Sequence, residues 1–440
     1  MKEVILINSP LENMDKKMEK EDSIPPLGLG YIAYQLEKNG FKVELLDGFN
    51  KALSKEKIIE IINEKKIYAI TINIFTSNMD LVKYVVENLN IEIKIVIGGL
   101  VVKDIYKEII KWNVKAELNI VVGEGEYITP QLLLDRDKVE YIFSQENKRV
   151  YKVDTKSIYF PREISGLKIN RKIFENEPQK NKYGQQEAYL ISSRGCPYKC
   201  SFCGAANSSY NREIDIFKIR RSNKESILAE INDIKKLYPE VESIRVLDDL
   251  FLSSIKKIDE AIQVFNEVGL EWRAMAHSNS FLELSDQKFK ELKESGCREL
   301  FIGIESGCEN ILKKINKERK NSELLIHIEK LLKNNINIKG YFIYGFPNEK
   351  KENMIKTYEL FKKIKKIEEK YKKGKFETSV FGYRPYHGTE LYQEALKCHN
   401  SGSKNLGLAS ISKKESFNLN IKNYSNVSDE ELENFIKKTR

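Results

Sequence analysis

The chain has 440 residues, of which 41% are hydrophobic, 10% are aromatic and 32% are charged. This composition excludes intrinsic disorder as the dominant state, and 23 glycines and 10 prolines are too few for a collagen-like or low-complexity chain. The net charge of +9 is modest and scattered, and no apolar run approaches the ~20 residues of a membrane-spanning helix, so we expect a cytoplasmic protein.

The first 135 residues alternate short apolar runs with amphipathic stretches. We expect strands at 4–8, 41–47, 68–75, 93–99 and 117–126, and helices at 27–39, 55–65, 79–88 and 103–111. Because parallel strands need helical crossovers, this order predicts a doubly wound, flavodoxin-like parallel sheet in a domain spanning residues 1–135.

Ligands of such sheets bind at the carboxyl ends of the strands. Tight turns would explain any one of the small or polar residues at these ends, but as a set they leave room for a flat or bulky ligand. The candidates are Ser9, Thr76, Ser77, Gly98, Gly99, Gly123, Glu124 and Gly125.

Residues 136–187 are polar and weakly periodic, and we interpret them as a connector that contains one short hairpin. A second alternation follows, with strand candidates at 188–193, 242–249, 271–278, 299–306, 338–345 and 376–384. Strand–helix repeats of this kind predict a partial (β/α)6 barrel over residues 188–396. Residues 397–440 are too short and polar for another domain, so we expect a C-terminal cap or tail.

The strongest chemical signal is the segment that contains Cys196, Cys200 and Cys203, directly after the first barrel strand. Three thiolates at these spacings can hold one iron–sulfur cluster within a single loop, which leaves one iron of a four-iron cubane open to another ligand. A structural zinc site would need a fourth Cys or His nearby, whereas the first histidine of the chain is His277.

This segment resembles the CxxxCxxC signature of the radical S-adenosylmethionine (radical SAM) superfamily, which has an aromatic residue, here Phe202, before the last cysteine. The resemblance implies a [4Fe–4S] cluster held by Cys196, Cys200 and Cys203, with S-adenosylmethionine chelated to the open iron. It also implies one-electron cleavage of the sulfonium to a 5′-deoxyadenosyl radical, and an electron donor such as flavodoxin or ferredoxin.

Further strand ends match the positions at which this superfamily binds S-adenosylmethionine. The resemblance assigns Asp248 and Asp249 to the methionine ammonium, and Glu305 and Ser306 to the ribose and methionine. Ile343 and Phe202 are assigned to the adenine. Taken singly, each acid could instead be a strand-end cap or turn residue, which is less easily true of all of them together.

The N-terminal domain is similar to that of the cobalamin-binding class of these enzymes, on the evidence of segments 24–48 and 121–126 and of the two glycines after the fourth strand. The resemblance implies a corrin lying across the carboxyl edge of the sheet and facing the barrel. Since no histidine precedes His277, none from this domain can bind cobalt. Some relatives keep the sheet without the cofactor.

These features favour a cobalamin-dependent radical SAM methyltransferase that acts on an unactivated carbon of a small molecule or peptide. The alternative on the same scaffold is an enzyme that rearranges, cyclises or otherwise transforms its substrate without methylation, with or without cobalamin. A nucleic-acid partner is disfavoured because residues 397–440 are too short for an RNA-binding module. No catalytic residue is assigned, and candidate substrate contacts are His277, Tyr383, Arg384 and His387.

Overall fold

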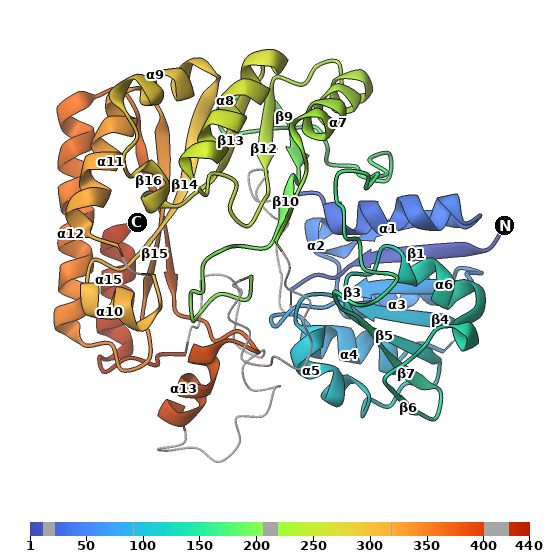
Figure 1. Ribbon diagram of the computed structural model, residues 1–440. Coiled ribbons are helices and arrows are strands. Elements are labelled where there is room, and N and C mark those ends of the chain that lie inside the picture. Colours follow the sequence, from blue (N-terminus) through green and yellow to red (C-terminus); the bar gives the residue numbers. More distant parts are fainter. Residues whose placement is uncertain (12–22, 91, 206–218, 318, 400–421) are drawn as a thin grey trace.

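Two lobes, each built on a parallel sheet covered by helices, lie side by side in the computed structural model of the protein (Figure 1). The structure describes residues 1–11, 23–90, 92–205, 219–317, 319–399 and 422–440.

The N-terminal lobe is drawn in blue to teal in Figure 1. Its elements in chain order are β1 (Glu3–Asn8), α1 (Leu27–Lys38), β2 (Lys42–Asp47), α2 (Gly48–Lys51), α3 (Lys55–Asn63), β3 (Ala69–Asn73), α4 (Met79–Glu87), β4 (Lys94–Gly98), α5 (Val102–Ile109), β5 (Glu117–Gly123), α6 (Ile128–Asp135), η1 (Arg136–Lys138), β6 (Phe143–Gln145) and β7 (Lys148–Val153).

The strand order β2-β1-β3-β4-β5-β7-β6 confirms the flavodoxin-like prediction. Strands β1 to β5 pair in parallel and are buried by helices on both faces, which is why they appear in the sequence as continuous apolar runs. The order reverses between β1 and β3, and in such sheets ligands bind outside the strand ends at this switch point.

The hairpin expected inside the connector is present, because β6 and β7 pair antiparallel. However, β7 also pairs in parallel with β5, so the sheet continues to Val153, past the predicted boundary at residue 135. The physical reason is burial, since Val150, Tyr151 and Val153 are fully buried and complete the core. The polar residues around this short strand obscured its pattern.

The C-terminal lobe contains, in chain order, β8 (Gln179–Lys180), β9 (Gln186–Leu190), β10 (Ser193–Arg194), β11 (Arg220–Arg221), α7 (Lys224–Leu237), β12 (Ser243–Val246), α8 (Ile255–Val268), β13 (Glu271–Ala276), η2 (Ser278–Phe281), α9 (Asp286–Glu294), β14 (Cys297–Glu305), α10 (Glu309–Lys314), α11 (Asn321–Lys333), β15 (Asn337–Tyr344), α12 (Lys351–Tyr371), β16 (Phe376–Gly382), α13 (Glu390–His399) and α15 (Asp429–Thr439). The sheet order β16-β15-β14-β13-β12-β9-β8 follows the chain and leaves β16 at an edge. This confirms the partial barrel, in which all neighbours pair in parallel except β8 and β9.

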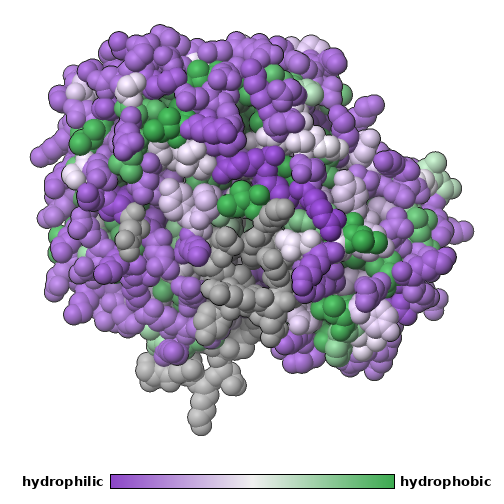
Figure 2. Space-filling view, viewed as in Figure 1, coloured by the Kyte–Doolittle hydropathy of each residue, from purple (hydrophilic) through white to green (hydrophobic). Residues whose placement is uncertain are grey.

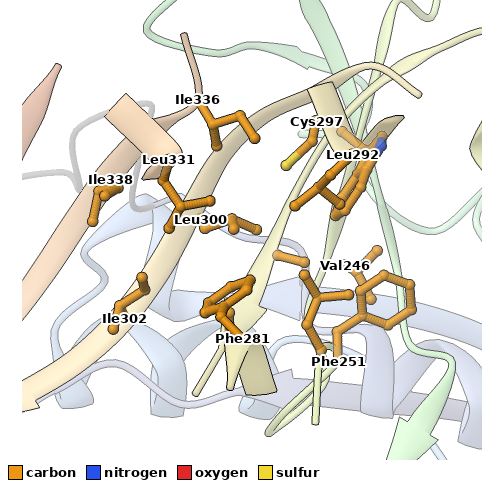
Figure 3. Close-up of a cluster of buried hydrophobic side chains, with 14 of the residues drawn as sticks. Val246, Phe251, Phe281, Leu292, Cys297, Leu300, Ile302, Leu331, Ile336 and Ile338 are labelled. Atoms are coloured by element: carbon orange, nitrogen blue, oxygen red, sulfur yellow. The ribbon is translucent and has the colours of Figure 1, made fainter. Parts of the chain in front are cut away.

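An apolar core joins the barrel strands to the helices outside them, and part of it is shown in Figure 3. Helix α8 illustrates how the sequence builds this layer. The Ser254 side chain caps its start by accepting from the Lys257 backbone N–H, and Gly269 ends it at a φ of 72°. Its buried face includes Phe265, whose ring stacks on Trp272 at 4.8 Å between centroids.

Helix α15 packs on the same core through Leu432 and Ile436, and Tyr344 Oη lies 2.9 Å from Thr439 Oγ1. The predicted C-terminal cap therefore includes this helix, while residues 400–421 of the expected tail lie outside the described residues. No helix in the described ranges is long and apolar enough to cross a membrane. The face seen in Figure 2 is largely hydrophilic, with apolar residues scattered over it.

Charged side chains fill the barrel near the amino ends of its strands. Arg273 is 1% exposed and donates to Glu187 (Nε to Oε1, 2.8 Å) and to Glu299 (Nη1 to Oε2, 3.1 Å), and both carboxylates are fully buried. Buried charges are tolerated only while they are paired. The opposite, carboxyl ends of the strands remain available for chemistry.

Replacing Arg273 with Met should destabilise the fold by about 3–5 kcal/mol, because the buried carboxylate of Glu187 then loses its counter-charge and that of Glu299 keeps only Lys182. The free energy of unfolding from urea titration measures this. Lys57→Met is the matched control, since Lys57 pairs with Glu60 on the surface, and should leave the free energy of unfolding nearly unchanged. Equal effects of the two substitutions would contradict the assignment.

Candidate functional site

A cavity of about 880 Å³ lies between the two lobes. Residues that follow β1, β3, β4 and β5 line one side, and residues that follow β9, β12 and β16 line the other. The carboxyl ends of both parallel sheets therefore meet at this cavity, where both folds are expected to bind ligands.

Most of the sheet-edge residues expected from the sequence line the cavity. They are Thr76, Ser77, Gly98, Gly99, Gly123, Glu124 and Gly125. Ser9 does not line it, and its backbone N–H instead donates to Asn73 Oδ1 at 2.8 Å. Sequence reasoning missed Lys103 and Asp104, which also line the cavity and form an ion pair of 3.1 Å in the first turn of α5.

The two glycines at the end of β4, Gly98 and Gly99, differ in the space around them. Gly99 has a φ of 132°, and a Cβ there would lie 2.4 Å from the Ile74 carbonyl oxygen, so only glycine fits this approach. A Cβ on Gly98 would meet nothing within 4 Å. The floor of the cavity is thus open at Gly98, as a broad, flat ligand requires.

Several buried polar atoms that line the cavity lack a hydrogen-bond partner among the described residues. They are Thr71 Oγ1, Asp104 Oδ1, Glu126 Oε2 and His387 Nε2. Such atoms are costly unless a ligand or water satisfies them. A corrin carries amide groups around its rim, and these can both donate and accept, so the polar atoms present fit cobalamin.

The cysteine segment forms one wall of the same cavity, through Cys196 and Gly204. The loop closes on itself with a hydrogen bond from the Cys203 N–H to the Cys200 carbonyl (3.1 Å). It also packs on α10, because the Ser201 N–H donates to the Ile315 carbonyl (3.0 Å). The three thiols form no disulfides.

The donor set of this loop suits a cluster better than a single ion. Within the described ranges, no group of three or more His, Cys, Asp or Glu side chains converges so as to hold one metal ion. In a cubane each thiolate binds a different iron, so the sulfurs need not converge on one point. Burial raises the pKa of the Cys200 thiol to about 11, so iron has to displace a proton on binding.

A buried cation that the sequence did not reveal lies beside the cysteines. Lys317 Nζ donates to Glu305 Oε1 at 2.6 Å, and its charge opposes the rise in the pKa of Cys196, Cys200 and Cys203 that burial causes. A Cβ on Gly303 would lie 2.3 Å from Lys317 Nζ, so the glycine makes room for the pair. The expected ligand contact Glu305 is thus bound to a lysine.

The two aspartates after β12 differ. Both Asp248 oxygens accept hydrogen bonds from the backbone N–H and hydroxyl groups of Ser192 and Ser193, at 2.6–2.9 Å, and Asp248 does not line the cavity. Asp249 lines the cavity and accepts from the Gly195 N–H at 3.0 Å. Of the pair expected to hold the methionine ammonium, only Asp249 is in position to reach a ligand.

The remaining expected S-adenosylmethionine contacts also divide into two groups. Ser306 is fully buried, with its hydroxyl 3.0 Å from Thr357 Oγ1, and does not line the cavity. Phe202 and Ile343 pack against one apolar cluster, in which the Phe202 and Phe346 ring centroids lie 5.9 Å apart. The expected adenine contacts therefore border the same apolar cluster, and neither lines the cavity.

Two of the four expected substrate contacts line the cavity, namely Arg384 and His387. Tyr383 is buried in the apolar cluster with Phe346, and the His277 ring stacks on Tyr198 of the cysteine loop at 3.9 Å between centroids. Tyr383 and His277 therefore pack against residues near the cavity and do not line it.

His387 connects the two lobes. Its Nδ1 lies 3.3 Å from the hydroxyl of Thr76, which follows β3, while His387 itself follows β16. Burial lowers the pKa of His387 to about 4, so the imidazole is neutral at pH 7.

His387 should make stability depend on pH. The unfolded chain takes up a proton near pH 6.5 that the folded protein excludes down to about pH 4, so stability is fully present above pH 6.5 and falls on acidification below it. Between pH 7 and pH 5, the wild type should lose about 2 kcal/mol more free energy of unfolding than His387→Gln. Parallel profiles in urea titrations would contradict this.

Two family models match the chain. Residues 20–133 match the B12 binding domain, and residues 190–361 match the radical SAM superfamily. The chain is a radical SAM protein with a B12-binding domain. Its cofactors are a [4Fe–4S] cluster, S-adenosylmethionine and cobalamin.

Proteins with similar sequences, and a solved structure with a similar fold, are named as methyltransferases. The chain is 25% identical to an uncharacterised methyltransferase of Pyrococcus horikoshii, over 89% of this chain and 83% of the relative. It is 23% identical to cytidylyl-2-hydroxyethylphosphonate methyltransferase of Streptomyces wedmorensis, over 84% and 78%. The solved structure of the radical S-adenosylmethionine methyltransferase TsrM from Kitasatospora setae, with cobalamin and a [4Fe–4S] cluster bound, has the same fold, with a TM-score of 0.61 and 15% identity over 90% of this chain and 75% of TsrM.

Proposed function

We propose that this radical SAM protein is a cobalamin-dependent methyltransferase that adds a methyl group to an unactivated carbon. The observation that carries the proposal is the shared cavity, whose walls include Cys196 and Asp249 of the barrel and Gly98 and Gly125 of the B12-binding domain. The two cofactor regions are also in contact, since a Cβ on Gly204 would lie 3.6 Å from Leu100 Cδ2. One substrate in this cavity can meet both.

When bound, the cluster would supply the electron that cleaves one S-adenosylmethionine, and cobalamin would carry to the substrate radical a methyl group taken from a second S-adenosylmethionine, which leaves as S-adenosylhomocysteine. On the barrel side, Cys196, Cys200 and Cys203 hold the cluster, and Asp249 accepts hydrogen bonds from the methionine ammonium. Phe202 and Ile343 form the apolar contact for the adenine. These apolar side chains also keep water away from the radical.

On the opposite side, Gly98 and Gly99 would form the floor under the corrin, with Thr76, Ser77, Gly123 and Gly125 around it. Asp104 Oδ1 and Glu126 Oε2 accept from the amide rim, which satisfies atoms otherwise left unpaired among the described residues. The relative from S. wedmorensis and TsrM are both named as methyltransferases, which supports the same reaction class here.

We further propose a cytoplasmic enzyme that receives electrons from flavodoxin or ferredoxin and acts on a small molecule or peptide, without nucleic acid. Arg384 and His387 line the barrel side of the cavity and contact the substrate. The guanidinium of Arg384 suits a substrate carboxylate or phosphate, and the neutral imidazole of His387 suits a hydroxyl or amide.

Product analysis tests the proposal. The protein is reconstituted with iron and sulfide without oxygen, loaded with hydroxocobalamin, and incubated with S-adenosylmethionine and a reductant. We expect both 5′-deoxyadenosine and S-adenosylhomocysteine by mass spectrometry. Release of 5′-deoxyadenosine alone would contradict methyl transfer and favour a rearrangement, cyclisation or other non-methylating reaction.

The cluster assignment predicts that Cys200→Ala loses the four-iron cluster and 5′-deoxyadenosine formation, because one iron then lacks its thiolate. Cys398→Ala is the matched control, since Cys398 lies on α13 away from the cavity lining, and should keep both. Iron counts and Mössbauer spectra measure the outcome. A full four-iron signal in Cys200→Ala would refute the ligand set.

A further inference from the structure

The cysteine segment emerges from a two-stranded ribbon, hereafter the ribbon, formed by β10 and β11. Ser193 pairs with Arg221 and Arg194 pairs with Arg220, antiparallel, and the chain between the strands contains Cys196, Cys200 and Cys203. Opposite residues of an antiparallel pair lie on the same face, and successive residues on opposite faces. The ribbon therefore has one face with Arg194 and Arg220 and another with Ser193 and Arg221.

The arginine face binds the B12-binding domain. Glu124, in the loop after β5, accepts from Arg194 Nη1 (2.5 Å) and from Arg220 Nη1 (3.0 Å), and its other oxygen accepts from Arg220 Nη2. Arg194 also pairs with Glu126 at 2.7 Å. Arg220 donates to the Pro161 carbonyl at 2.6 Å.

Aromatic contacts reinforce this face. The Arg194 guanidinium lies 5.2 Å from the centre of the Tyr31 ring on α1, and the Arg220 guanidinium lies 4.3 Å from that of Phe160. The side chain of Arg220 is only 6% exposed, so these charges are largely shielded from water and from salt.

The other face binds the barrel. Ser193 donates to Asp248 through its backbone N–H (2.9 Å) and its hydroxyl (2.7 Å), and Arg221 Nη2 donates to Ser253 Oγ at 2.9 Å. Asp248 and Ser253 both follow β12. The side chains of one ribbon thus hold both lobes, and the ribbon flanks the cysteine loop at both ends.

We propose that the ribbon sets the distance between the iron–sulfur cluster and cobalamin, with Glu124 and Asp248 as its positioning residues. This inference rests on the proposed function, since it requires both cofactors in one cavity. In the sequence, Glu124 and Asp248 resemble cofactor contacts. Here they have a different role, as anchors of the loop that carries the cluster.

Relaxation of the cob(II)alamin EPR signal tests this without turnover. A reduced, paramagnetic cluster nearby speeds that relaxation, and the effect falls steeply with distance. Protein loaded with cluster and hydroxocobalamin, then reduced, should show strong enhancement. Glu124→Gln and Asp248→Asn keep the side-chain shape but weaken the anchors, and each should at least halve the enhancement while iron and cobalamin contents stay full.

Glu60→Gln, on the surface of α3, is the matched control and should leave the enhancement unchanged. If Glu124→Gln or Asp248→Asn fails to fold, Arg220→Lys decides, because lysine keeps the charge but cannot bind both Glu124 oxygens and the Pro161 carbonyl together. An unchanged enhancement with full cofactor contents would overturn the proposal, as would a wild type that binds no cobalamin. Absence of S-adenosylhomocysteine would overturn methyl transfer alone and leave this result standing.

Discussion

The carboxyl ends of two parallel sheets meet at one cavity, and the chemistry of this protein depends on that arrangement. Each fold places its ligand outside its strand ends, where short loops can vary without disturbing the core. The loops after β4 and β5 and the cysteine loop after β9 line opposite walls. Two cofactors, each suited to one fold, can therefore act on one substrate without leaving the cavity.

Buried polar groups stabilise the fold in one region and line the ligand cavity in another. At the amino ends of the barrel strands, Arg273 and its two glutamates are mutually paired, which leaves them no capacity for a ligand. At the carboxyl ends, Asp104, Glu126 and His387 each keep a buried atom without a partner among the described residues. Unsatisfied polar atoms raise the free energy of the empty protein, and a ligand that satisfies them gains affinity.

Sequence periodicity was sufficient for both folds, because most of their strands are continuous apolar runs separated by amphipathic helices. It predicted the hairpin that contains β7 but not the parallel pairing of β7 with β5, because that pairing joins segments far apart in the sequence. Motif spacing identified the three cysteines and most of the glycines that line the cavity, because both patterns follow from the backbone conformation of their loops. It could not show that Asp248 and Glu124 bind Ser193, Arg194 and Arg220, because those contacts join residues far apart in sequence. Lys317 was missed for the same reason, as a lysine in a polar stretch carries no local sign of burial.

Anomalous X-ray diffraction at the iron and cobalt edges can locate both metals in the cavity. The crystals are grown from anaerobically reconstituted protein loaded with hydroxocobalamin. We expect an iron peak beside Cys196, Cys200 and Cys203, and a cobalt peak in the same cavity above Gly98. A cobalt peak outside this cavity, or an occupied iron site with no cobalt in the crystal, would contradict this expectation.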